Sequence, residues 1–282
     1  MPAVEVAAGT IEYEDSGGSG PVLVLLHGLI MDGSLWRDVV PKLAPEYRCI
    51  LPTLPLGAHR QPMRADADLS MGGIANILGE FLERLDLRDV TVVLSDWGGP
   101  FLLIGSEWDE RIARLVVTNC EAFDNVPPQG AARALPYVAR IPGGVAMALL
   151  PFRFDRLRRL PMTYGPLSKT RVPREVMDRW FGPSLQQRAV RRDLRKYLLS
   201  AHQGRRELVA ATKPLGRFNR PVLVAWAPED SLMPHRHAEQ LVELFPQGQL
   251  VEVDDSYTLI PQDQPDLLAS HMLEFLRSPA AA

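Results

Sequence analysis

The chain has 282 residues, of which 46% are hydrophobic and 23% charged, and its net charge is −3 at pH 7. This length suffices for one large domain or for a core with an insertion, and the near-neutral charge gives no reason to expect nucleic acid as a partner. The first ten residues lack the basic and apolar regions of a signal peptide, and no apolar run reaches the roughly 20 residues of a membrane span. We therefore expect a cytoplasmic protein without a membrane partner.

Apolar runs alternate with helical patterns along the first 120 residues. A helical spacing of apolar residues covers 69–87, and we expect another helix after Gly98 and Gly99. Cys49 and Cys120 fall in apolar runs, which indicates core thiols rather than a disulfide. The continuous apolar runs predict strands buried on both faces of a parallel sheet, at 21–26, 48–51, 90–94 and 115–118.

The pattern changes after Phe123. Residues 125–220 are rich in Pro and Arg and contain helical patterns at 174–181 and 186–201. Strands and helices then alternate again, at 221–226, 236–244, 250–253 and 265–276. The sequence therefore predicts an α/β fold whose mostly parallel sheet, in residues 1–124 and 221–282, is interrupted by a helical cap at 125–220.

The stretch VLSDWGGP, at 93–100, predicts a sharp turn from a strand into a helix. Such a turn presents one side chain at its tip and requires small residues two and three positions later. If Ser95 were the tip, the bulky Trp97 would occupy the first of these positions, whereas Asp96 is followed there by Gly98 and Gly99. We therefore predict that Asp96 is the nucleophile.

The stretch SDWGGP resembles the elbow, the strand-to-helix turn that carries the nucleophile, in the α/β-hydrolase fold, in its epoxide hydrolase and haloalkane dehalogenase branch. HGLIMDGSLW resembles the oxyanion loop of that fold, and PVLVAWAPEDSLMPHRHAEQL resembles the segment with the triad acid, which places this acid at Asp230. The resemblance implies backbone N–H donors at Leu29 and Trp97. It also implies that a carboxylate attacks an sp³ carbon of a small substrate, forming an ester with the enzyme.

The resemblance further implies a set of substrate-binding residues. The Trp97 indole would donate to a leaving halide or only pack in the core, and a tyrosine of the insertion would protonate an opening epoxide oxygen. No metal or other cofactor is implied, and the expected partner is a small-molecule substrate; a homodimer stays open. The substrate-binding candidates are His27, Trp97, Tyr137, Tyr164, Tyr197 and Thr258.

The histidine that should activate water is missing from its expected place. That region reads VEVDDSYTLIPQDQP, with Thr258 where the family has His, and no histidine lies between His237 and His271. A threonine hydroxyl is not a general base at neutral pH. Another histidine would have to serve, and His59 in the loop LPLGAHR is the best-placed candidate, ahead of His202, His235 and His237.

Two other hypotheses follow from the missing histidine. Asp96 could act as a general acid or base in a non-hydrolytic reaction, such as a cyclisation, isomerisation or elimination. Alternatively, the protein binds a ligand without chemistry. Residues 151–217 contain seventeen basic and five acidic side chains. They form either a solvated surface or a receptor for an anionic substrate.

Overall fold

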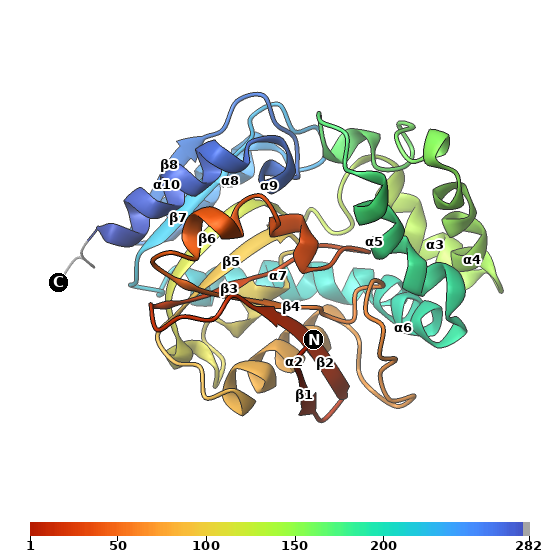
Figure 1. Ribbon diagram of the computed structural model, residues 1–282, viewed down its shortest axis with the longest axis horizontal. Coiled ribbons are helices and arrows are strands. Elements are labelled where there is room, and N and C mark those ends of the chain that lie inside the picture. Colours follow the sequence, from red (N-terminus) through yellow and green to blue (C-terminus); the bar gives the residue numbers. More distant parts are fainter. Residues whose placement is uncertain (279–282) are drawn as a thin grey trace.

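The computed structural model describes residues 1–278, which form a twisted eight-stranded sheet with helices on both faces and a group of helices at one end (Figure 1). The order of the strands is β1-β2-β4-β3-β5-β6-β7-β8. β1 and β2 form an antiparallel hairpin, β2 pairs antiparallel with β4, and the remaining pairs are parallel. The strands are β1 (Ala3–Val6), β2 (Gly9–Asp15), β3 (Val22–Leu25), β4 (Arg48–Pro52), β5 (Val90–Asp96), β6 (Ile112–Cys120), β7 (Val222–Trp226) and β8 (Gly248–Glu252).

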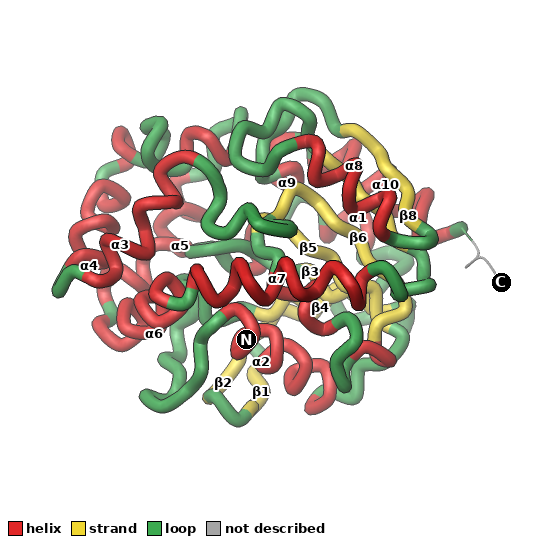
Figure 2. The backbone as a smooth tube through the Cα atoms, turned by 180° about the vertical axis from the view of Figure 1, so that it is seen from behind, coloured by secondary structure: helices red, strands yellow, loops and turns green. Residues whose placement is uncertain are grey.

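The core helices pack on the two faces of the sheet. α1 contacts α10, while α2 and α7 contact each other and the short 3₁₀ helix η2 that follows β5. Figure 2, which views the molecule from behind, shows α7 lying across the face of the sheet that is turned away in Figure 1. These helices are α1 (Val40–Leu43), α2 (Met71–Arg84), η2 (Gly99–Leu103), α7 (Ala201–Leu215), α8 (His235–Leu244), α9 (Ile260–Asp263) and α10 (Pro265–Arg277).

Residues 121–221 form a helical insertion between β6 and β7. Its first four helices lie together beyond the end of the sheet (Figure 1), whereas α7 packs on the core. The helices beyond the sheet are α3 (Leu135–Arg140), α4 (Gly144–Leu149), α5 (Arg174–Gln186) and α6 (Arg188–Leu199), with short 3₁₀ turns between them.

The predicted α/β-hydrolase fold is confirmed, with one local correction. The helix expected after Gly98 and Gly99 is only the 3₁₀ helix η2. Glycine and proline are the poorest helix formers, and Pro100 follows the two glycines. Gly105 then adopts a φ of +78°, which turns the chain where it passes Pro214 of α7. Cys49 and Cys120 are buried free thiols. Within residues 1–278, no helix has the length and apolar character to cross a membrane.

Candidate active site

Asp96 occupies the tip of a strained turn at the end of β5. Its φ is +65°, a left-handed conformation that non-glycine residues seldom adopt, and such strain is concentrated at functional sites. The Trp97 backbone N–H donates to the Ser95 carbonyl oxygen at 2.7 Å, which closes the turn. Ser95 itself is fully buried, whereas Asp96 is partly accessible and lines a cavity. The fold thus presents Asp96 and not Ser95.

Three glycines leave the room that this turn needs. A Cβ atom on Gly98 would lie 2.0 Å from the Glu121 carbonyl oxygen, and one on Gly99 would lie 1.9 Å from the Trp97 ring. A Cβ atom on Gly28 would lie 1.8 Å from Asp96 Oδ2. The backbone of the loop after β3 therefore approaches the carboxyl more closely than any other residue type would permit.

The loop after β3 supplies one backbone donor to Asp96. The Leu29 N–H donates to Asp96 Oδ2 at 3.1 Å, whereas the Trp97 N–H is bonded to Ser95. His27 lies behind this loop and does not line the cavity. Its Nδ1 donates to the Gly28 carbonyl at 2.8 Å and its Nε2 accepts from the Leu54 N–H at 2.9 Å. Burial lowers the pKa of His27, so the neutral ring positions the loop.

Two carboxyl groups with raised pKa values face the cavity. Burial raises the pKa of Asp96 to about 6; the Leu29 N–H opposes this shift, and the charge of Asp230 adds to it. Burial, followed by the Asp96 charge, raises the pKa of Glu121 to about 8. The sequence analysis did not select Glu121. Its position directly after β6, next to the strand β5 that ends in Asp96, was the available signal, because sites in α/β sheets open at the carboxyl ends of strands.

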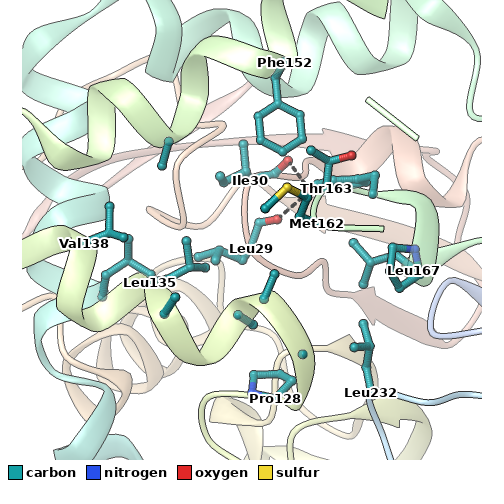
Figure 3. A pocket seen from close by; sticks show the side chains of 18 of the residues that line it. Leu29, Ile30, Pro128, Leu135, Val138, Phe152, Met162, Thr163, Leu167 and Leu232 are labelled. Atoms are coloured by element: carbon teal, nitrogen blue, oxygen red, sulfur yellow. Dashed lines mark hydrogen bonds between the residues drawn. The ribbon is translucent and has the colours of Figure 1, made fainter. Parts of the chain in front are cut away.

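The cavity over Asp96 has a volume of about 840 Å³ and lies between the sheet and the insertion. Figure 3 shows Leu135, Val138 and Phe152 of the insertion facing the same space as Leu29 and Leu232 of the core. Its lining contains no Lys, Arg or His. The size and lining suit a small, largely apolar ligand, and the lining gives no support to an anionic substrate.

The expected tyrosines have three different surroundings. Tyr164 lines the cavity, but its hydroxyl proton is shared between the Leu29 and Ile30 carbonyl oxygens, at 2.9 and 3.1 Å. Tyr197 lines the cavity with its hydroxyl 3.5 Å from Glu121 Oε2. Tyr137 is 57% exposed and does not line the cavity. Thus the structure brings Tyr164 and Tyr197 to the site and leaves Tyr137 outside it.

Trp97 contributes its ring to the wall of the cavity. The buried indole N–H lies near the Tyr197 hydroxyl, but within residues 1–278 it makes no hydrogen bond of ordinary geometry. An unsatisfied buried donor costs about 1–3 kcal/mol, so a group that accepts from it on binding would recover this energy. Trp97 is therefore suited both to packing and to holding an acceptor atom of a ligand.

Asp230 and Thr258 are joined to each other and do not line the cavity. The Thr258 hydroxyl donates to Asp230 Oδ2 at 2.8 Å, and the Asn119 amide donates to the same oxygen at 2.9 Å. The Leu232 N–H donates to Oδ1 at 2.8 Å. Burial raises the pKa of Asp230 despite these donors. The threonine hydroxyl thus satisfies the carboxyl that the sequence resemblance assigned as the triad acid, whose role in an intact triad is to orient a histidine.

The alternative histidines lie away from the cavity. His59 is buried; its Nε2 is 3.3 Å from Asp193 Oδ2 of α6, and its Nδ1 accepts from the Gly57 N–H at 3.3 Å. His202 is exposed on α7, His235 Nε2 is 2.8 Å from Glu252, and His237 packs its ring edge-on to Phe123. The structure therefore brings none of these four to Asp96.

Several arginines of the insertion are paired with acidic side chains. Arg179 on α5 forms ion pairs with Asp32 and Glu14 of the core. Asp32 is fully buried beside the loop that carries Leu29, and the Ser34 hydroxyl donates to it at 2.6 Å. Burial opposes its ionisation, but the Ser34 hydrogen bonds and the Arg179 charge outweigh burial and lower the pKa of Asp32. The basic residues thus serve partly to fix the insertion to the core.

Comparison with known proteins places the chain in a family. The family model described as alpha/beta hydrolase fold matches residues 21–261, so the chain belongs to this family. It is 26% identical to haloalkane dehalogenase 2 of Mycobacterium tuberculosis over 271 residues, which cover 94% of this chain and 91% of that protein. The crystal structure of haloalkane dehalogenase DbeA from Bradyrhizobium elkani superimposes with a TM-score of 0.80 at 20% identity, covering 98% of this chain and 96% of the other.

Two further similarities are local. A haloalkane dehalogenase of Mesorhizobium japonicum is 37% identical over 95 residues, which span 34% of this chain and only 30% of that protein. A cis-3-alkyl-4-alkyloxetan-2-one decarboxylase of Xanthomonas campestris is 36% identical over 131 residues, or 42% of each chain. The chain is therefore a member of the α/β-hydrolase fold family that is similar in sequence to haloalkane dehalogenases and, locally, to this decarboxylase.

Proposed function

We propose that this protein is a cofactor-independent enzyme that uses Asp96 as a nucleophile against an sp³ carbon of a small apolar molecule, as in epoxide hydrolases or haloalkane dehalogenases. The observation that carries this proposal is the placement of Asp96. Its carboxyl stands at the tip of a strained turn, accepts from the Leu29 N–H, and faces an apolar cavity of about 840 Å³. Attack breaks the bond from carbon to its leaving group and forms an Asp96 ester.

Intact-protein mass spectrometry tests this proposal. The protein is incubated with a panel of alkyl epoxides and primary bromoalkanes, and Asp96→Asn serves as the matched control. We expect a mass increase of one epoxide, or of one alkyl group, on the wild-type chain and none on Asp96→Asn. A protein that bound these compounds without any adduct or product would contradict the nucleophilic role.

A non-hydrolytic reaction is the second candidate. Two observations favour it. The Thr258 hydroxyl donates a hydrogen bond to Asp230, and no histidine is among the described residues that line the cavity. A decarboxylase of alkyl-substituted oxetanones is among the relatives, and Asp96 could assist such an elimination as nucleophile or as base. A cis-dialkyl β-lactone as substrate distinguishes the candidates: an alkene and carbon dioxide as products would favour elimination, whereas a β-hydroxy acid that has gained one water would favour hydrolysis.

A further inference from the structure

Glu121 and Asp96 form a pair of neighbouring carboxyl groups. Asp96 ends β5 and Glu121 follows β6, and these strands are adjacent and parallel, with Asp96 in register with Cys120. The Glu121 backbone N–H donates to the Asp96 carbonyl oxygen at 3.0 Å. Both side chains line the same cavity, whose lining contains no cationic side chain to neutralise them. The sheet therefore holds the two carboxyls together over one ligand site.

The surroundings of the pair assign different protonation states to its members. Glu121 is 7% exposed, and burial together with the charge of Asp96 raises its pKa to about 8, compared with about 6 for Asp96. Two carboxylates that share a poorly hydrated site do not both ionise at neutral pH. At pH 7 the pair therefore consists of an ionised Asp96 and a protonated Glu121.

We propose that Glu121 is the proton-transfer residue of this site: it protonates the oxygen that leaves when Asp96 opens an epoxide, and its carboxylate then activates the water that hydrolyses the ester. This inference rests on the proposed nucleophilic role of Asp96. It divides the work between two carboxyls, as retaining glycosidases do, and requires no histidine.

The two steps balance without another reactant. First, an Asp96 oxygen bonds to an epoxide carbon, the ring C–O bond breaks, and the Glu121 proton moves to the epoxide oxygen. Water then loses a proton to the Glu121 carboxylate and bonds to the Asp96 Cγ. The ester C–O bond breaks, and the departing alkoxide takes the proton left on the Asp96 carboxyl. A diol is released, Asp96 is again ionised, and Glu121 is again protonated.

The structure favours an epoxide because its leaving oxygen must be protonated, whereas a halide leaves as an anion. The Tyr164 hydroxyl is bonded to two backbone carbonyls, Tyr137 is exposed, and the Thr258 hydroxyl is bonded to Asp230. Tyr197 also lines the cavity, with its hydroxyl 3.5 Å from Glu121 Oε2, but burial raises the pKa of Tyr197 well above its usual value. Glu121 is therefore the stronger acid of these two groups at the cavity. Esterification also removes the charge of Asp96 that helps to keep Glu121 protonated. Glu121 can then ionise at the step that needs a base.

Glu121→Gln tests the inference, because glutamine reproduces the shape and neutrality of the protonated acid but carries no transferable proton. The wild type, Glu121→Gln and Asp96→Asn are each given a terminal alkyl epoxide and a primary bromoalkane of equal chain length in H₂¹⁸O. Exposed Glu83→Gln on α2 is the matched control. Adducts are followed by intact mass and products by chromatography, and the ¹⁸O content of Asp96 is measured by peptide mass.

We expect the wild type to turn over the epoxide and to acquire ¹⁸O at Asp96. Glu121→Gln should open the epoxide about 10²–10⁴-fold more slowly, the range usual for general acid–base catalysis. It should still be alkylated by the bromoalkane within a few fold of the wild-type rate, and that adduct should persist. Glu121→Asp, which keeps the acid, should recover part of the epoxide turnover and gives the same test if the glutamine variant does not fold.

Other outcomes separate the two proposals. Equal turnover of wild type and Glu121→Gln would overturn the role of Glu121 and leave Asp96 as the nucleophile. If the wild type accumulated adduct but released no product, the role of Glu121 would likewise be overturned and Asp96 would remain the nucleophile. If no adduct or product forms with either compound, the nucleophilic function fails, and the proton-transfer role fails with it.

Discussion

Replacing Gly28 with alanine should displace the Asp96 carboxyl without unfolding the protein. The added Cβ atom would lie 1.8 Å from Asp96 Oδ2, although Cβ contacts under 3.0 Å are essentially never seen. Either the carboxyl or the loop must therefore retreat by about 1 Å, which also disrupts the 3.1 Å hydrogen bond from the Leu29 N–H. Misplacing a reacting group by about 1 Å costs on the order of 100-fold in rate.

The assay is the rate of adduct formation on Asp96 with a primary bromoalkane, followed by intact mass. Gly28→Ala should react about 100-fold more slowly, and its free energy of unfolding should fall by about 1–3 kcal/mol through overpacking. Gly182→Ala is the matched control, since the nearest atom to its added Cβ, in the Gln186 side chain, lies at 3.9 Å. A Gly28→Ala protein that reacts at the wild-type rate would refute the proposed geometry of attack.

Four further predictions concern the polar groups around the site. Because burial raises the pKa of Asp96 to about 6, adduct formation should decline as the pH falls through 6; a decline only near pH 4 would contradict this environment. That pKa exceeds the value of 3.8 for an exposed Asp, so the ionised group destabilises the fold at higher pH; thermal denaturation should show Asp96→Asn to be more stable, by an amount that grows from pH 4 to 6. Thr258→Val removes a donor to Asp230 and should cost about 1–3 kcal/mol in urea unfolding without slowing adduct formation, whereas a slower reaction would place Thr258 in the chemistry. His59→Gln should likewise lower stability by about 1–3 kcal/mol, because it disturbs the buried contact with Asp193, and a large loss of turnover instead would restore His59 as a catalytic base.

The sheet was predictable because its strands are continuous apolar runs that end in turn residues. The elbow was predictable for a related reason: Gly98 and Gly99 stand where a Cβ atom would strike Glu121 and Trp97. A local backbone requirement of this kind leaves its mark on neighbouring positions of the sequence. The terminal hairpin β1–β2 was not predicted, since its strands AVEV and GTIEYED mix polar with apolar residues and are partly exposed.

The composition of the site was less predictable because it depends on contacts between distant segments. His59 lies in a loop near the correct edge of the sheet, but Asp193, 134 positions away, holds its ring. Tyr164 and Tyr137 look equivalent in the sequence, yet one reaches the Leu29 loop and the other is exposed. The position of Glu121 after a strand could be read from the sequence, but its burial beside Asp96 could not.

The Arg179 ion pairs join the insertion to the loop that carries Leu29. Arg179 of α5 pairs with Asp32, a fully buried carboxylate three positions after Leu29, and with Glu14 of β2. If α5 moved away, the Asp32 charge would keep only Arg60 as a cationic partner within residues 1–278, and the Arg60 Nη2 lies 3.5 Å away. Because the Leu29 N–H donates to Asp96, the position of this donor is coupled through one ion pair to the position of α5.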